Sequence, residues 1–214
     1  MQVIDLTHTI SEDMPVFPGT MPPVISLTNT YQKDGFKESC INMVTHTGTH
    51  MDPPVHVLPN QPTIDGLDVK HFVGPGIVID VSNKSEGDSI TIDDILPYRE
   101  ATDNADFLLF YTGWDSYWGK SEYFGDYPAV DDSVISYIND TRKKGIGVDV
   151  IGLDPVVDKM LVHHRQLFCN GDKVIIENLT NLDRLIGKDF IFIALPLKIK
   201  NGDGSPVRAV AVIQ

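Results

Sequence analysis

Metal-ligating side chains are concentrated in the segment Thr45–His56. Three of the seven histidines, His46, His50 and His56, lie there within eleven residues, together with Asp52. Imidazole nitrogens and carboxylate oxygens are ligands that zinc and manganese accept. The cluster therefore predicts a metal site that activates water.

The spacing of these residues requires the chain to turn. A straight strand rises about 3.3 Å per residue, which would place His46 and Asp52 roughly 20 Å apart, too far for one ion. Gly48 can adopt backbone angles that other residues avoid, so a turn there is favoured. Alternatively, His46 and His50 could meet on one helical turn, with Cβ atoms about 5–6 Å apart.

Two prolines follow Asp52 and force extended backbone on the residue before each of them. We therefore expect a strand to end near Thr45, a curved segment to present the ligands, and an extended exit toward His56. A single histidine in a strand is usually a hydrogen-bonded core or surface residue. Three histidines and an aspartate around a glycine and two prolines favour metal binding instead.

The composition is that of an acidic globular protein. The 214 residues carry a formal net charge of −13, and 42% of them are hydrophobic. One domain over residues 1–214 is the simplest organisation. The negative charge argues against nucleic acid and anionic membranes as partners, because both attract basic surfaces. A small-molecule substrate is the expected partner.

The N-terminal residues and the hydropathy of the chain predict its cellular compartment. The N-terminal residues Met1–Asp5 show no leader pattern, and no stretch approaches the roughly 18 apolar residues of a membrane span. We therefore expect a cytoplasmic protein. Cys40 and Cys169 do not form a CxxC pair and are expected to be buried free thiols, because both lie among apolar residues.

Short apolar runs predict strands, and runs that are apolar throughout indicate burial on both faces. The expected strands are Val3–Thr7, Ser39–Thr45, Gly76–Val81, Asp106–Tyr111, Gly147–Gly152, Lys173–Glu177, Phe190–Leu195 and Val207–Ile213.

Helical spacing predicts a helix that starts after the N-cap Asp131 and stops at Gly145. Shorter helices are expected near Thr91, over Val162–Phe168, near Ser116 and over Asn181–Leu185. Together these elements predict an α/β fold with a mixed, strand-rich sheet and a few flanking helices. No phosphate-binding glycine loop is present.

Further ligands must come from elsewhere in the chain, and the candidates are His163, His164 and Glu177. Adjacent helical residues point about 100° apart, so only one of the two histidines is expected to face a metal. A glutamate that ends a buried strand is costly unless it is paired, protonated or bound to a cation. A salt bridge or a cap on the next turn is the alternative for Glu177, but the first motif favours the ligand role.

Other polar and aromatic residues have simpler expected roles. The remaining histidines, His8 and His71, should be structural or exposed. Turn and capping roles are expected for the aspartates at strand ends, Asp80, Asp149 and Asp154. Three aromatic residues could line a substrate pocket, although core positions are commoner: Trp114, Tyr117 and Trp118.

The run His46–His56 reads HTGTHMDPPVH. It resembles the HxGTHxDxPxH signature of the cyclase-like metal hydrolases, which include bacterial kynurenine formamidases and isatin hydrolases. The resemblance covers nearly the whole chain. Supporting segments are similar at Pro15–Gly19, Ile176–Leu179, Ala194–Leu197 and Ser205–Val210.

This resemblance implies the swivelling β/β/α fold of the family and a set of metal ligands. It implies that His46, His50 and Asp52 bind metal, and that His56 shuttles protons. A later histidine and Glu177 would complete a two-metal site bridged by Asp52.

Aligning His164–Leu167 with the family's helix favours His164 over His163 as the later histidine. This alignment needs one extra residue in the Asn170–Lys173 turn. The implied cofactor is one or two divalent cations, with zinc first and manganese as the alternative. The chain is also expected to form a homodimer or homotetramer.

The expected activity is metal-dependent hydrolysis of a small amide, lactam or lactone. An arylformamidase-like reaction on N-formylkynurenine, from tryptophan catabolism, is the leading named candidate. Phe17 stands where kynurenine formamidases commonly have tryptophan, so we expect Phe17 to contact substrate and N-formylkynurenine to be a poor one. An isomerase or cyclase acting through an enolate and a non-catalytic metal-binding protein are the alternatives.

Overall fold

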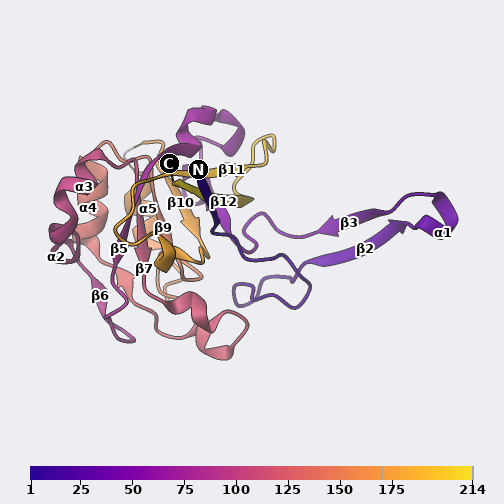
Figure 1. Ribbon diagram of the computed structural model, residues 1–214, viewed down its shortest axis with the longest axis horizontal. Coiled ribbons are helices and arrows are strands. Elements are labelled where there is room, and N and C mark those ends of the chain that lie inside the picture. The colour runs from indigo at the N-terminus through magenta and orange to yellow at the C-terminus, as the bar shows by residue number, and fades with distance from the viewer. Residues whose placement is uncertain (170, 214) are drawn as a thin grey trace.

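The computed structural model describes residues 1–169 and 171–213, and these residues form a mixed sheet that closes on itself (Figure 1). The strand order is β1-β12-β11-β5-β7-β9-β10-β4, and β12 also pairs with β4. The strands of this sheet are β1 (Gln2–Asp5), β4 (His50–Asp52), β5 (Val73–Asp80), β7 (Phe107–Tyr111), β9 (Gly145–Val148), β10 (Val174–Glu177), β11 (Phe190–Pro196) and β12 (Ser205–Ile213). The predicted α/β fold with a mixed, strand-rich sheet is confirmed.

Four neighbouring strands of the sheet, β5, β7, β9 and β10, run parallel to one another. The pairs that complete the ring, β5–β11, β11–β12, β12–β4 and β4–β10, are antiparallel. Helices pack outside the ring, on the left in Figure 1. They are α2 (Ile92–Ile95), α3 (Arg99–Asn104), α4 (Asp132–Asp140) and α5 (Val162–Phe168).

Strand β7 shows how the two faces of the sheet are filled. Phe107 and Leu109 belong to one buried cluster, and Leu108 and Phe110 belong to another that includes apolar residues of α4 and α5. All four are fully buried. The run is apolar throughout because both faces of the strand are covered, as the sequence indicated.

A β-hairpin projects away from the closed sheet, on the right in Figure 1. It consists of β2 (Val24–Asn29) and β3 (Glu38–Asn42), joined through the short helix α1 (Tyr31–Asp34). Cross-strand pairing places Ile25 opposite Ile41 and Leu27 opposite Ser39, so one face of the hairpin is largely apolar. These side chains are exposed, and Leu27 is 57% exposed. Among the described residues, no helix is long and apolar enough to span a membrane.

The α4 helix ends earlier than predicted. Asp131 is its N-cap, as expected, and accepts hydrogen bonds from the Ser133 and Val134 N–H groups. The helix ends at Asp140, and Gly145 begins β9 instead of stopping a helix. Gly145 is required there because a Cβ atom would collide with the Val174 carbonyl oxygen of the adjacent strand.

Other local expectations were wrong or only partly correct. Cys40 and Cys169 are exposed because Cys40 lies on the hairpin and Cys169 follows the last turn of α5. The strand expected at Ser39–Thr45 is β3 of the hairpin and ends at Asn42. The strand expected at Gly147–Gly152 starts at Gly145 and ends before Asp149. Two of the expected short helices are 3₁₀ turns, Trp114–Tyr117 and Leu182–Leu185.

Candidate metal centre

Three candidate ligands share one face of the strand pair β4–β10. In this antiparallel pair His50 lies opposite Glu177, and Met51 lies opposite Ile176. Met51 and Ile176 point into the interior of the closed sheet. His50, Asp52 and Glu177 therefore point to the other face, because successive side chains of a strand alternate.

The curved segment before β4 brings His46 to the same place. Gly48 has a positive φ of 64°, and a Cβ atom there would lie 2.8 Å from the Met14 Cε atom. The turn places His46 Nδ1 2.6 Å from Asp52 Oδ1. The imidazole of His46 also packs so closely on Gly204 that a side chain at Gly204 would collide with it. The predicted turn at Gly48 is confirmed.

His50 is oriented by the backbone of this turn. Its Nδ1–H donates to the Gly48 carbonyl oxygen at 2.8 Å, since a carbonyl can only accept. His50 Nε2 therefore faces Asp52 Oδ1 at 3.3 Å and Glu177 Oε2 at 3.5 Å.

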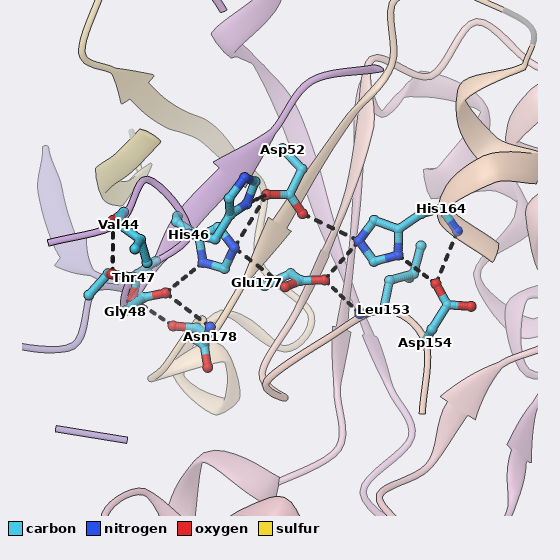
Figure 2. Close-up of polar contacts among 12 residues, drawn as sticks. Val44, His46, Thr47, Gly48, Asp52, Leu153, Asp154, His164, Glu177 and Asn178 are labelled. Atoms are coloured by element: carbon cyan, nitrogen blue, oxygen red, sulfur yellow. Dashed lines mark hydrogen bonds and ion pairs between the residues drawn. The ribbon is translucent and has the colours of Figure 1, made fainter. Parts of the chain in front are cut away.

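His164 on α5 faces the same two carboxylates from the opposite side (Figure 2). Its Nε2 lies 3.3 Å from Asp52 Oδ2 and 3.3 Å from Glu177 Oε1. Asp52 and Glu177 thus each present one oxygen to His50 and the other to His164. Two carboxylates placed in this way could be shared by two divalent cations, which would together polarise a carbonyl and activate water.

Asp154 holds His164 in this position. Its Oδ2 accepts the His164 Nδ1–H at 2.5 Å, and its carboxylate also accepts the backbone N–H groups of His163 and His164. Asp154 caps α5, as its place after a strand suggested. Its second task, orienting a candidate ligand, was missed, although an aspartate closely preceding a histidine-bearing helix is a signal for it.

Asn178 is a second residue that the sequence did not single out. Its amide nitrogen donates to the Gly48 carbonyl oxygen at 2.9 Å, and its amide oxygen accepts from the Tyr123 hydroxyl at 2.8 Å. Asn178 therefore fixes the turn that carries His46 and His50.

His163 and His56 lie differently relative to the carboxylates. His163 is directed to Asp154 and Asp132, with Nδ1 3.3 Å from Asp154 Oδ1, and does not reach Asp52 or Glu177. His56 packs against His46 with ring centroids 3.9 Å apart and the ring planes tilted by 36°. The ligand atoms of His46, Asp52 and His56 lie within 4.8 Å of one another.

The exit from β4 was predicted to be extended, but it forms a 3₁₀ turn over Pro54–His56. This turn brings His56 close to the carboxylates. Proline at the first position of this turn has the φ angle that a helical turn requires, which favours the compact conformation.

The site is buried and acidic, and histidines compensate its charge. Burial opposes ionisation of Asp52, but His50 and His46 hold its pKa well below the usual value. Burial also disfavours the His50 cation, yet the carboxylates of Asp52 and Glu177 raise the pKa of His50 to about 9. Burial lowers the pKa of His56.

This donor set fits a divalent cation. Asp52 is 1% exposed and Glu177 is buried, and among the described residues the charged partners of both are histidines. Two buried carboxylates surrounded by imidazole nitrogens are the hard and borderline donors that zinc or manganese prefers. No cysteine belongs to the group, which distinguishes it from the common structural zinc sites.

A cavity of about 630 Å³ opens above the candidate ligands. Phe17 lines it, together with residues that flank the root of the hairpin, such as Val16 and Val44. The aromatic residues after β7 pack elsewhere: Trp114 donates to the Tyr123 carbonyl oxygen, and Trp118 stacks on His8 with ring centroids 3.8 Å apart.

Fold and site together describe an α/β protein with a candidate centre for divalent cations. The model of the Cyclase family, described as "Putative cyclase", matches residues 4–155. The chain belongs to this family.

Relatives and solved structures resemble the chain over nearly its full length. A kynurenine formamidase from Bacillus mycoides is 34% identical over 211 residues, which cover 98% of this chain and 96% of that protein. Isatin hydrolase A from Labrenzia aggregata, bound to benzyl benzoate, has a TM-score of 0.83 and 28% identity, covering 99% of this chain and 93% of that one. A structure titled as a potential metal-dependent hydrolase with cyclase activity has a TM-score of 0.78 and 29% identity, covering 98% and 96%.

Proposed function

We propose that this protein is a metal-dependent hydrolase that cleaves a small amide, lactam or lactone. The observation that carries the proposal is the paired presentation of Asp52 and Glu177. Each directs one carboxylate oxygen to His50 and the other to His164. The names of the relatives, formamidase and hydrolase, support the same reaction class.

In this proposal His50, Asp52 and Glu177 would hold one divalent cation, with His46 as a further ligand beside Asp52, and His164 would join the two carboxylates around a second. Zinc is the first candidate and manganese the alternative, because both accept imidazole and carboxylate ligands. A bound divalent cation lowers the pKa of water toward about 7 and polarises a carbonyl oxygen.

His56 is the proposed proton shuttle. It lies at the floor of the cavity beside His46, within reach of a molecule seated above the ligands. Its imidazole takes a proton from the attacking water as the oxygen bonds to the carbonyl carbon. It then returns a proton to the leaving nitrogen or oxygen as the bond to carbon breaks. The apolar walls limit access of further water.

The leading substrate class is an arylformamide. Phe17 offers an aromatic face in the cavity wall, and its side chain is 37% exposed. Phenylalanine has less stacking area than tryptophan and no N–H donor. We therefore expect N-formylkynurenine to be turned over less efficiently than simpler aryl formamides or lactams.

The test is a hydrolysis screen with enzyme reconstituted with zinc, manganese or cobalt, over formamides, lactams and lactones in ¹⁸O-labelled water. Hydrolysis predicts one solvent oxygen in the acid product. Turnover without ¹⁸O incorporation would replace the proposal with an isomerase or cyclase. Fully loaded enzyme that turns over no member of the panel would leave a metal-binding protein without hydrolase activity.

We also propose that the chain works as a homodimer or homotetramer. The apolar face of the β2–β3 hairpin, formed by Ile25, Leu27 and Ile41, is exposed. A two-stranded hairpin is marginally stable alone in water, so a second copy of the chain packed on this face would stabilise it. Sedimentation velocity tests this: a monomer at micromolar concentration would contradict it.

A further inference from the structure

The cavity above the candidate ligands has mostly apolar walls. Apolar side chains form most of them: Pro15, Val16, Phe17, Met43, Val44, Ile151, Pro155 and Leu161. The part of a substrate that lies away from the bond being cleaved must rest against these residues. An aliphatic or aromatic group would gain the free energy of apolar burial there.

The charged group nearest the rim is the carboxylate of Asp203. It lines the cavity, its side chain is 57% exposed, and its Oδ2 lies 3.4 Å from His46 Nε2. Asp203 Oδ1 accepts a hydrogen bond from the Thr45 hydroxyl. Asp203 therefore places negative charge at an exposed part of the cavity lining, beside the candidate ligand His46.

Two of the polar side chains of the wall, those of Thr45 and Asn178, are already engaged, while the wall also contains Thr20. Thr45 donates to Asp203. Asn178 donates to Gly48 and accepts from Tyr123. Beyond the attraction of the cations proposed at the ligands, a carboxylate held against this wall would lose its water to apolar carbon and face Asp203, and both of these effects oppose binding.

We propose that this site selects substrates whose non-reacting part is uncharged and apolar, and that Asp203 is the residue that discriminates against anionic ones. The proposal rests on the hydrolase function proposed above and names its substrate class. It gives a reason, independent of Phe17, why an amino-acid derivative with a free carboxylate is a poor substrate.

A matched pair of substrates isolates the effect. Methyl 4-formamidobenzoate and 4-formamidobenzoate share one aryl formamide and differ in a charge on the far side of the ring. After correction for their rates of hydroxide-catalysed hydrolysis, we expect kcat/KM to favour the ester on the order of tenfold. The ratio does not depend on metal occupancy, because both substrates meet the same enzyme.

Two variants test the role of Asp203. Asp203→Asn should reduce the preference for the ester a few-fold, and Asp203→Lys should reduce it further or reverse it. Asp172→Asn is the control, because it removes the same charge from a side chain that is 65% exposed and does not line the cavity. Added salt should weaken the preference in the wild type but not in Asp203→Asn, because screening acts on the charge at the rim.

Equal efficiency toward both substrates would overturn the proposal, as would an ester preference that Asp203 variants leave unchanged. If loaded enzyme hydrolyses neither substrate, the hydrolase function fails. Calorimetric titration with the two amine products, methyl 4-aminobenzoate and 4-aminobenzoate, then measures the selectivity of binding without any need for turnover. Tighter binding of the ester product supports the proposal, and equal binding contradicts it.

Discussion

Apolar side chains are buried in the closed sheet but exposed on the β2–β3 hairpin. In the sheet, residues such as Leu109 and Ile176 have no exposed surface. In the hairpin, Leu27 and Ile41 are more than half exposed. The candidate ligands lie on the closed sheet, on the turn that precedes β4 and on α5, whereas residues at the root of the hairpin supply a wall of the cavity. The candidate ligands therefore belong to the well-packed region, and the projecting hairpin borders the cavity through which a substrate would reach them.

Removing a ligand from the well-packed region should have the largest effect. His50→Ala should lose bound metal, because His50 Nε2 faces both Asp52 and Glu177. Elemental analysis of the purified variant provides the measurement, with hydrolysis expected to fall to background. Metal content equal to that of wild type would remove His50 from the ligand set.

The next effect concerns the proton shuttle. His56→Ala should keep its metal but lose about 10²–10⁴-fold in turnover, the usual contribution of a general acid–base group. Metal content and kcat must be measured on one preparation, because His56 lies within ligand distance of His46 and Asp52. Loss of metal would make His56 a ligand, and near-normal turnover would exclude it from the mechanism.

A smaller effect is expected from the residue that orients His164. Asp154→Asn should weaken metal affinity about 10–100-fold, the usual result of removing a hydrogen-bond partner of a ligand. Asp131→Asn is the matched control, because Asp131 caps α4 in the way that Asp154 caps α5 but contacts no candidate ligand. Equal losses in both variants would reduce Asp154 to a helix cap.

The smallest effect on the closed sheet should come from the hairpin. Leu27→Asp places a charge on the apolar face and should dissociate the oligomer. It should leave the unfolding temperature of the sheet within a few degrees, because Leu27 does not contact the buried clusters. Ser26→Asp, on the opposite face of the same strand, is the control. An unchanged sedimentation coefficient for Leu27→Asp would place the subunit contact elsewhere.

The sequence was informative where one residue type has one physical use. Gly48 required a turn, the continuous apolar run Phe107–Tyr111 required burial on both faces, and Asp131 required a helix start. The motif His46–His56 also favoured a ligand role for Glu177 before any fold was known. In the structure these residues meet through the pairing of β4 with β10.

The remaining features depend on long-range neighbours that local patterns do not encode. Gly145 has the sequence signature of a helix stop, but its small size serves the close approach to Val174. Cys40 lies in an apolar run, yet that run belongs to an exposed hairpin. Asp154 has the signature of a cap, and its contact with His164 depends on the side-chain direction within α5.

The closure of the sheet has a consequence for when the site can form. Strand β4 is held between β10 and β12, and its partners on β12 are Ser205 and Pro206, about 150 residues later in the chain. Bringing such distant segments together costs loop-closure entropy before any contact is gained, so these pairings form slowly. On the ribosome, the histidines of the motif emerge about 150 residues before the β12 residues that pair with β4. The sheet around the candidate metal centre therefore closes only after β12 has been made.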